Sequence, residues 1–274
     1  MPPELLICLI CIAVLAVLIL AYLILIKPAS VRGVDVARYG KRFAHRGLWD
    51  EQSPENSLAA FQKAVDAGYG IEFDIHMTRD GHVVVFHDDT LVRMCSVEGK
   101  IEDKTLAELC ELRLKGTDQK IPLLSEMLEL VDGRVPLLVE LKGAALDTSL
   151  CPAADAILSQ YKGEYMIESF NPMLVRWYRK NRPDVVRGQL FCNLLKEKKG
   201  NKLFYFLITV LATNILAKPH FLAYGQSSVH NLSFVICKYL YKTPAFVWTV
   251  RAQEQIPDDL RNEGIIFEGF IPKD

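Results

Sequence analysis

Three short apolar runs early in the chain are each followed by ionisable side chains. The runs are Phe43-Ala44, Ile71 to Ile75 and Val83 to Phe86. Their length and their β-branched and aromatic content predict strands. Each run delivers carboxylate or imidazole groups near its C-terminal end, where a parallel α/β barrel keeps its chemistry.

Strand-like and helix-like segments alternate along the rest of the chain, which is typical of parallel βα units. Helices are predicted over residues 57–67, with Ser57 as N-cap, and over 125–131, 171–180 and 233–241. Further strands are predicted over residues 136–142, 165–169, 185–191, 221–224 and 246–250, which brings the count to eight. We therefore predict an α/β fold, a (β/α)8 TIM barrel, with a small insertion near the barrel mouth between His87 and Ile121.

The N-terminal stretch from Leu5 to Ile26 is apolar and carries no charged residue. At about 1.5 Å per residue it is long enough to cross a hydrocarbon core of roughly 30 Å. We predict a transmembrane anchor over residues 1–27, a linker over 28–40 and a barrel domain over 41–274. A cleaved signal peptide is the alternative, which the lack of Lys or Arg before the run disfavours.

Charge on either side of the apolar stretch predicts its orientation. Glu4 is the only charged residue before it, whereas five basic residues follow closely: Lys27, Arg32, Arg38, Lys41 and Arg42. The positive-inside rule then predicts a single-pass protein of the cell membrane with a cytoplasmic catalytic domain. The seven cysteines lack a framework spacing and favour reduced thiols. A net charge of -1 argues against nucleic acid as a partner.

A second unusually apolar segment runs from Leu203 to Leu216. It is too short to span a bilayer, and Tyr205, Thr209 and Thr213 form its only polar stripe. We predict that it lies on the membrane surface, with the lipid bilayer as a partner. The basic run that precedes it would favour anionic headgroups: Lys196, Lys198, Lys199 and Lys202.

Candidate chemistry is concentrated on the predicted strands. Glu72 and Asp74 are two residues apart, so both carboxylates point to one side of a strand, an arrangement that is costly unless a cation lies between them. His45 and His87 supply two imidazoles. In Glu140-x-Lys142 the carboxylate and the amine also share a side, and the two could meet a metal and a phosphate or form an internal ion pair.

The ordered motifs resemble the glycerophosphodiester phosphodiesterase family, and the resemblance covers roughly residues 41 to 270. Its first part is His45-Arg46-Gly47, Pro54-Glu55-Asn56-Ser57, Ile71-Glu72-Phe73-Asp74 and Val83-Val84-Val85-Phe86-His87-Asp88. It continues with Ile121-Pro122-Leu123-Leu124, Val139-Glu140-Leu141-Lys142, Ser169-Phe170 and Trp248-Thr249-Val250. With the predicted anchor, the chain looks like a membrane-anchored member of bacterial type.

The resemblance implies hydrolysis of a glycerophosphodiester to glycerol 3-phosphate and an alcohol. It implies a site assembled from eight residues, with Glu72, Asp74 and Glu140 as ligands of Mg²⁺ or Ca²⁺, Arg46, Lys142 and Trp248 as substrate-binding groups, and His45 and His87 as the acid and base. The alternatives are a phospholipase C-like or lysophospholipase D-like enzyme, and an inactive membrane-tethered binding module. The substrate is expected to be a small molecule or a lysolipid phosphodiester. Direct attack by water and a cyclic phosphate intermediate both remain open.

One departure from the family pattern lies near the C-terminus. Many members end in an Ile-Thr-Asp turn, whereas this chain has Ile265-Ile266-Phe267-Glu268-Gly269-Phe270. This departure puts in doubt any polar contribution from the last strand, but it affects none of the proposed catalytic residues.

Overall fold

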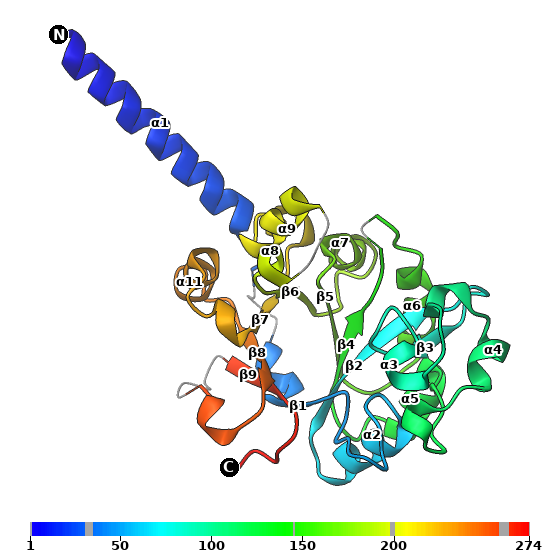
Figure 1. Ribbon diagram of the computed structural model, residues 1–274. Coiled ribbons are helices and arrows are strands. Elements are labelled where there is room, and N and C mark those ends of the chain that lie inside the picture. Colours follow the sequence, from blue (N-terminus) through cyan, green and yellow to red (C-terminus); the bar gives the residue numbers. More distant parts are fainter. Residues whose placement is uncertain (1, 31–34, 145, 198–200, 258–262, 274) are drawn as a thin grey trace.

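The computed structural model describes residues 2–30, 35–144, 146–197, 201–257 and 263–273. Eight of its nine strands run parallel and close into a barrel, because β1 pairs with both β2 and β9 (Figure 1). The barrel strands are β1 Arg42–His45, β2 Gly70–Met77, β4 Leu137–Leu141, β5 Tyr165–Ser169, β6 Arg187–Phe191, β7 Phe221–Gly225, β8 Ala245–Val250 and β9 Glu263–Phe267. The predicted TIM barrel is confirmed.

One predicted barrel strand was wrong. The run beginning at Val83 forms β3 (Val83–Val85), which pairs antiparallel with β2 outside the barrel, and β9 takes the eighth place. The reason is the short turn between the two strands, in which the Thr78 amide donates to the His82 carbonyl and Gly81 has a φ of +84°. A parallel crossover needs a dozen or more residues, so a connection of this length can only make a hairpin.

Helices surround the barrel in the predicted alternation. They include α2 Leu58–Asp66, α5 Leu124–Val131, α6 Leu150–Leu158, α7 Pro172–Asn181 and α11 Leu232–Tyr239. The Ser57 hydroxyl accepts a hydrogen bond from the Ala60 amide and so caps α2 as predicted. The insertion contains α3 Val92–Cys95, η2 Ile101–Asp103, α4 Leu106–Cys110 and η3 Leu114–Gly116, around a small apolar cluster of its own that includes Leu91, Met94 and Leu109.

The inside of the barrel is layered. Phe43, Leu138 and Met166 are buried in the interior cluster, and each lies two residues before an ionisable residue on the same strand. Because side chains two apart on a strand share a face, an ionisable layer lies directly above an apolar one. Val36 and Tyr39, on η1 (Val36–Tyr39), are part of the same interior cluster.

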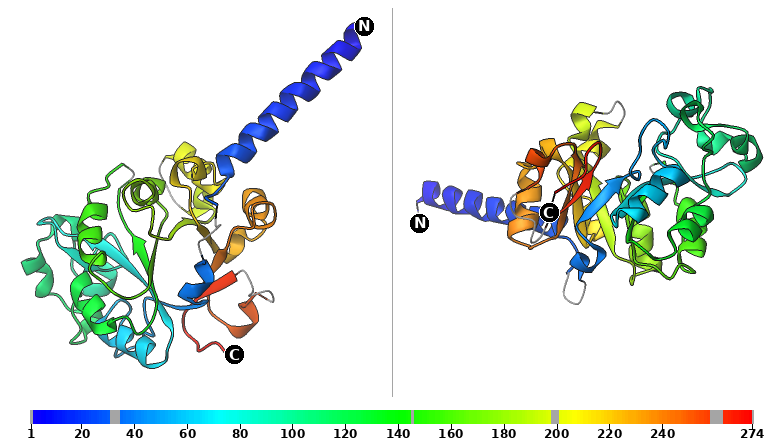
Figure 2. Two further views of the ribbon diagram at one scale, coloured as in Figure 1. Left: turned by 180° about the vertical axis from the view of Figure 1, so that it is seen from behind. Right: turned by 90° about the horizontal axis from the view of Figure 1, so that it is seen from below.

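The N-terminal helix α1 (Pro3–Ile26) extends away from the domain, and both views of Figure 2 agree on this. It is long and apolar enough to span a membrane. An apolar stretch within it has a mean hydropathy of 3.3, and only 6% of that stretch is buried. Ile26, at its C-terminal end, is nevertheless fully buried in the main hydrophobic core of the domain.

The apolar segment from Leu203 to Leu216 forms two helices instead of one. Helix α9 (Lys202–Thr209) and α10 (Asn214–Ala217) are separated by a break at which Leu211 has a φ of +55°, and the short α8 (Leu194–Glu197) precedes them. Thr209 and Thr213, two of the three residues of the polar stripe, are buried. Of the basic run before α9, Lys198 and Lys199 lie outside the described residues.

The tight turn after β1 provides a test of the fold. Gly47 has a φ of +85°, and a Cβ there would lie 2.8 Å from the Ala60 carbonyl carbon, whereas Gly81 has a similar φ and open space around it. Gly81→Ala should therefore cost about 1 kcal/mol from backbone strain alone, and Gly47→Ala about 3 kcal/mol because the clash adds to it. Urea unfolding of the two variants measures the difference, and equal losses would contradict this explanation.

Candidate active site

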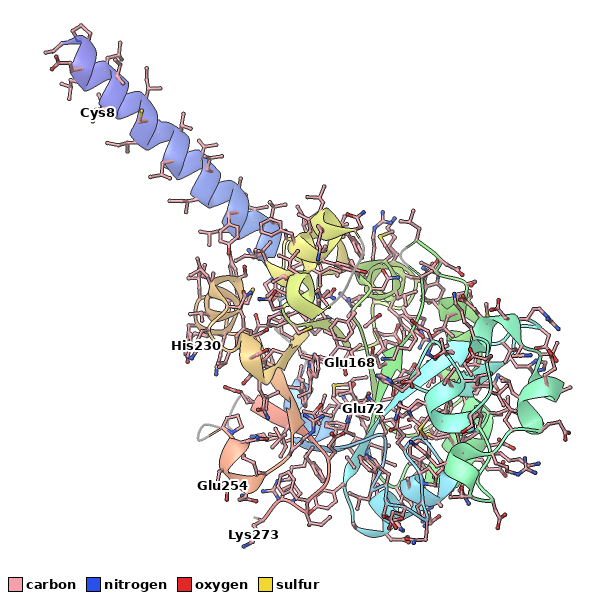
Figure 3. All side chains as sticks on the ribbon, viewed as in Figure 1. Cys8, Glu72, Glu168, His230, Glu254 and Lys273 are labelled. Atoms are coloured by element: carbon pink, nitrogen blue, oxygen red, sulfur yellow. The ribbon has the colours of Figure 1, made fainter. Side chains whose placement is uncertain are left out.

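The strand register brings the ionisable layer together. His45 is level with Glu72 on β2, Asp74 is level with Glu140 on β4, and Glu140 is level with Glu168 on β5. Figure 3 shows Glu72 and Glu168 among the central strands, away from the outer surface. The predicted inward direction of Glu72 and Asp74 is therefore observed, and a fourth carboxylate joins them.

Three of these carboxylates form a compact buried cluster. Oxygen atoms of Glu72, Asp74 and Glu140 all lie within 4.8 Å of one another, and Asp74 is fully buried. Burial, and then repulsion from Asp74 and Glu140, raises the pKa of Glu72 well above its usual value. Burial and the carboxylates of Glu140 and Asp74 do the same to the pKa of Glu168. Such crowding of negative charge is stable only if protons or cations compensate it.

Two basic side chains and an amide hold Asp74 in its charged form. Lys142 Nζ lies 2.9 Å from Asp74 Oδ1 and 2.7 Å from Glu140 Oε1, and Arg46 Nε lies 3.6 Å from Asp74 Oδ2. Asn56 Nδ2 donates to Asp74 Oδ2 at 3.0 Å. Burial alone would raise the pKa of Asp74, but Lys142, His87 and Arg46 hold it well below its usual range. Asp74 is therefore a carboxylate between cations.

His45 is held by a residue from the far end of the chain. Its Nδ1 lies 2.5 Å from Glu268 Oε2, and its Nε2 lies 3.8 Å from Glu72 Oε2. Burial would raise the pKa of Glu268, but hydrogen bonding to His45 and the charge of Arg251 lower it to about 2. An ionised carboxylate can only accept, so Nδ1 of His45 carries the proton and Nε2 faces the cluster. The polar contribution that the departure near the C-terminus put in doubt is made by Glu268, directly after β9.

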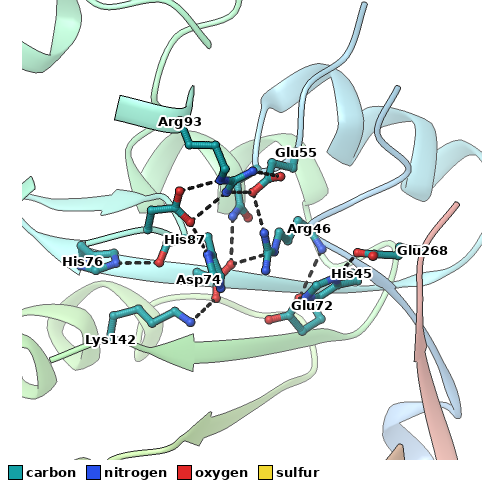
Figure 4. A network of polar contacts seen from close by, with 12 residues as sticks. His45, Arg46, Glu55, Glu72, Asp74, His76, His87, Arg93, Lys142 and Glu268 are labelled. Atoms are coloured by element: carbon teal, nitrogen blue, oxygen red, sulfur yellow. Dashed lines mark hydrogen bonds and ion pairs between the residues drawn. The ribbon is translucent and has the colours of Figure 1, made fainter. Parts of the chain in front are cut away.

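His87 has a similar support from the insertion. Its Nδ1 lies 2.6 Å from Asp88 Oδ1, and Arg93 on α3 binds Asp88 and also Glu55, which in turn accepts from Arg46 Nη1 at 2.7 Å (Figure 4). Hydrogen bonds from His87 and Arg93 lower the pKa of Asp88 despite its partial burial. Both imidazoles therefore keep their proton on Nδ1 and leave Nε2 for proton transfer.

The structure brings seven of the eight predicted site residues into one connected network. Trp248, the eighth, lies on β8, where it packs edge-on against Phe170 with ring centroids 5.6 Å apart. Its indole Nε1 has no hydrogen-bond partner within the described chain. Arg46, at a φ of +61°, donates its backbone amide to the Glu72 carbonyl, which fixes the turn that carries it.

Sequence reasoning assigned no role to six supporting residues: Glu55, Asn56, Asp88, Arg93, Glu168 and Glu268. Glu55, Asn56 and Asp88 stand within motifs of the family resemblance, and two of the other three carried a signal of their own. Glu168 stands in the alternating run Tyr165 to Ser169, which predicts an inward side chain by the same argument as Glu72 and Asp74. Glu268 directly follows an apolar strand, as His45 ends one. Arg93 carried no signal, because only the fold brings α3 over Asp88 and Glu55.

The residues present suit a hard divalent cation. The cluster offers only oxygen ligands, it is buried, and among the described residues Asp74 Oδ1 has no aligned hydrogen-bond donor although Lys142 lies close to it. Oxygen ligands of this kind are those that Mg²⁺ and Ca²⁺ prefer. The donor set thus agrees with the cofactor expected from the sequence.

A closed (β/α)8 barrel with clustered carboxylates, two supported imidazoles and two cations at its mouth defines a class of phosphate-ester hydrolases. Within this class, the chain belongs to the glycerophosphoryl diester phosphodiesterase family, whose sequence profile matches residues 45–268. It is a glycerophosphodiester phosphodiesterase.

Two relatives illustrate the breadth of the family. The chain is 36% identical over 168 residues to a glycerophosphodiester phosphodiesterase from Caldanaerobacter subterraneus subsp. tengcongensis, covering 56% of this chain and 68% of that protein. It is 32% identical over 236 residues to a lysophospholipase D from Mus musculus, covering 76% of this chain and 74% of that protein.

Solved structures share the fold. A glycerophosphodiester phosphodiesterase from Thermotoga maritima is 28% identical with a TM-score of 0.62, covering 82% of this chain and 93% of that one. An Oleispira antarctica phosphodiesterase, solved in complex with sn-glycerol-3-phosphate, superposes with a TM-score of 0.68 at 23% identity, covering 85% of this chain and 94% of that one. At that identity the second likeness shows the fold alone.

The contact between His45 and Glu268 yields a prediction. Glu268→Gln should lower kcat by about 10²-fold with little change in KM, because the imidazole loses the charge that holds its orientation. Because the pKa of Glu268 is lowered to about 2, its contribution to stability is present above the ordinary value of 4.5 and is lost as pH falls from there towards 2. The variant should lack this part of the acid destabilisation in urea unfolding at a series of pH values.

Arg251→Gln is the matched control. It removes the other partner of Glu268, whose Oε1 accepts from Arg251 Nε at 2.6 Å, but keeps the carboxylate beside His45. We expect kcat of this variant within a few-fold of the wild-type value. If both variants lose kcat equally, Glu268 supports the C-terminal turn and does not position the imidazole.

Proposed function

We propose that the protein is a membrane-anchored phosphodiesterase that hydrolyses glycerophosphodiesters to glycerol 3-phosphate and an alcohol, with a divalent cation and two histidines as acid and base. The observation that carries this proposal is the carboxylate cluster with His45 and His87 beside it and two cations against Asp74 (Figure 4). Glu72, Asp74 and Glu140 would hold Mg²⁺ or Ca²⁺. When bound, such a cation polarises a phosphoryl oxygen and neutralises charge that develops on it.

The two imidazoles divide the proton transfers. Burial lowers the pKa of His45 and so favours the neutral ring, which makes its Nε2 the base for the attacking oxygen. His87 Nε2 gives a proton to the alcohol oxygen as the phosphorus–oxygen bond to the alcohol breaks. After the products leave, transfer of a proton from His45 to His87 through solvent restores the starting state. Support from Glu268 and Asp88 keeps both rings oriented during these steps.

Arg46 and Lys142 bind the phosphate, in this proposal, and Trp248 lines the pocket beside it. Both cations already lie against Asp74, so a negatively charged phosphoryl group that approaches the cluster meets positive charge first. Arg46 is also tethered to Glu55, which limits the orientations of its guanidinium group. The half-buried indole of Trp248 offers an apolar face to the glycerol or alcohol part of the substrate.

The membrane part of the proposal depends on α1. We infer a single span within residues 1–27, a connection over 28–40 and a catalytic domain over 41–274, with the domain on the cytoplasmic side. The length and hydropathy of α1 and the basic residues that follow it support this orientation. The site lies on the domain side of this span, where cytoplasmic substrates reach it.

A lysophospholipase D activity is the second candidate. The observation that favours it is the similarity to the lysophospholipase D of Mus musculus over about three quarters of both chains. A span next to the catalytic domain would also keep the enzyme near lysolipids. Both reactions break the same type of phosphodiester bond, so the site would need no further catalytic group.

Removal of divalent cations tests the metal. Chelator should abolish hydrolysis of glycerophosphocholine and glycerophosphoethanolamine by the purified full-length enzyme, and Mg²⁺ or Ca²⁺ should restore it. Asp74→Asn should weaken cation binding more than it lowers the metal-free Tm. Cation binding is measured by calorimetry and by the thermal shift on adding metal. Full activity in chelator would rule out the metal mechanism, and the same assay on lysolipids decides between the two substrate classes.

The histidines should behave as one catalytic unit. His45→Ala and His87→Ala should each lower kcat about 10² to 10⁴-fold, which is the usual contribution of a positioned acid or base. The double variant should lose far less than the product of the two factors, because either loss alone disables proton transfer. His230→Ala, which changes an exposed histidine outside the network, is the control for general disturbance and should keep the wild-type kcat. Near-wild-type turnover in one single variant would reject the role of that histidine.

A further inference from the structure

Large apolar side chains are exposed on the helices next to the base of α1. On α11 the exposed apolar residues are Leu232 and Tyr239, which form one stripe and are 67% and 69% exposed. Leu240 follows directly after the helix. On α9 the exposed pair is Leu203 and Phe206, and α10 adds Ile215 and Leu216. We call these seven residues the apolar collar. Figures 1 and 2 place α9 and α11 on either side of the base of α1.

An outer barrel helix normally turns a polar face to water. The exposed large apolar residues among those described include none on α2, α5, α6 or α7, which cover other parts of the same barrel. Elsewhere in the described domain such residues are fewer, and several of them lie on loops, as with Leu146 and Ile271. Exposed large apolar residues that gather on the helices around the base of α1 indicate a contact with something other than water.

The end of α1 is fixed to these helices by hydrogen bonds. The Tyr22 hydroxyl pairs with Ser233 Oγ at 2.7 Å, and the Tyr241 hydroxyl donates to the Leu23 carbonyl at 2.9 Å. Asn214 Nδ2 donates to the Ile26 carbonyl at 2.8 Å. The last turn of α1 is therefore part of the domain, and the collar stands at a fixed depth along the helix.

Helix length determines that depth. A hydrocarbon core of roughly 30 Å needs about 20 residues at 1.5 Å each, and α1 has 24 residues in all. A span that begins at Pro3 therefore uses almost all of the helix before the domain, as far as Tyr22. No length remains to hold the domain away from the bilayer, so the helices that bind Tyr22 to Ile26 lie at the membrane interface.

Charge on this side of the domain matches an anionic surface. The chain has no Asp or Glu between Glu197 and Glu254, although its overall net charge is only -1. Lys218 Nζ donates to the Lys27 carbonyl, and Arg179 Nη1 donates to the carbonyls of Ile215 and Leu216 on α10. These three cations thus surround the junction of α1 with the domain. Lysine and arginine at that position attract anionic headgroups.

We propose that the apolar collar and these cations form a seat on which the catalytic barrel rests directly on an anionic membrane leaflet, in one orientation. This rests on the proposed span of α1 and adds a second contact with the same bilayer. The collar enters the headgroup and upper acyl region, and Lys27, Arg179 and Lys218 meet lipid phosphates. The active site is thereby held at a constant height above the leaflet.

Spin labels on the full-length protein test the seat. Single cysteines at Leu203 and Leu232 are labelled in a background in which Cys8, Cys11, Cys95 and Cys110 are serine, and the protein is reconstituted in phosphatidylcholine vesicles with and without phosphatidylglycerol. Labels at Leu15 in α1 and Val97 in the insertion serve as lipid and water references. Collisions with oxygen and with a water-soluble nickel chelate are measured, and hydrolysis of glycerophosphocholine confirms folding.

In anionic vesicles, both collar labels should show an oxygen-to-nickel ratio several-fold above that of Val97 and approaching that of Leu15. The double variant Leu240→Glu with Phe206→Glu should return the Leu232 label to the Val97 value with unchanged glycerophosphocholine hydrolysis, whereas Leu146→Glu should not. The double variant changes none of the catalytic residues.

Three results would overturn the seat. If the collar labels match the Val97 reference while the Leu15 label lies in lipid, the anchor is supported and the seat is rejected. Collar labels that neither reagent reaches would show that another protein surface covers the collar. Spectra broadened by coupling between labels, which disappears on dilution with unlabelled protein, would show that this surface belongs to a second copy. A water-like Leu15 label would reject the proposed span together with the seat. None of these outcomes depends on hydrolysis, so each is separable from failure of the catalytic proposal.

Discussion

Mutual repulsion among buried carboxylates is the constraint on which the rest of this structure depends. The barrel register forces Glu72, Asp74, Glu140 and Glu168 into one layer, and burial raises the cost of every negative charge there. Lys142, Arg46 and Asn56 converge on Asp74 because a carboxylate with no exposure cannot stay ionised otherwise. The same local excess of negative charge that destabilises this layer would make it bind a divalent cation. The catalytic proposal therefore rests on the groups that compensate the charge of the ionised carboxylates inside the barrel.

Closure of the barrel and the insertion extend this arrangement outward. Only because β9 pairs with β1 does Glu268 come within 2.5 Å of His45, more than two hundred positions away in the chain. On the other side, Arg93 joins Asp88, the partner of His87, to Glu55, the partner of Arg46. A single guanidinium group therefore couples the position of the His87 imidazole to that of Arg46, which we propose to bind the phosphate. Displacement of the insertion would disturb both.

The N-terminal helix is both a candidate span and a structural element of the domain. Ile26 is fully buried in the main core, and the carbonyls at the end of α1 accept hydrogen bonds from Asn214 and Lys218. Truncation after this helix would leave those donors and part of the core exposed to water, which is costly. For this reason the position of the barrel relative to the candidate span follows from packing and hydrogen bonds at a few residues.

Local sequence pattern predicted most of the helices and strands and indicated which chemical groups the site contains. Contacts between distant segments decided the rest. Alternating apolar residues predicted most of the strands, and spacing of two predicted that Glu72 and Asp74 share a side, because these are properties of a strand by itself. The antiparallel placement of β3 depends on a turn between Thr78 and His82, and the break in the apolar segment depends on Leu211 adopting a positive φ. Glu268 and Arg93 became recognisable only in three dimensions, because their roles come from partners that the sequence places far away. A single sequence records which groups are available, whereas pairing across the barrel selects which of them meet.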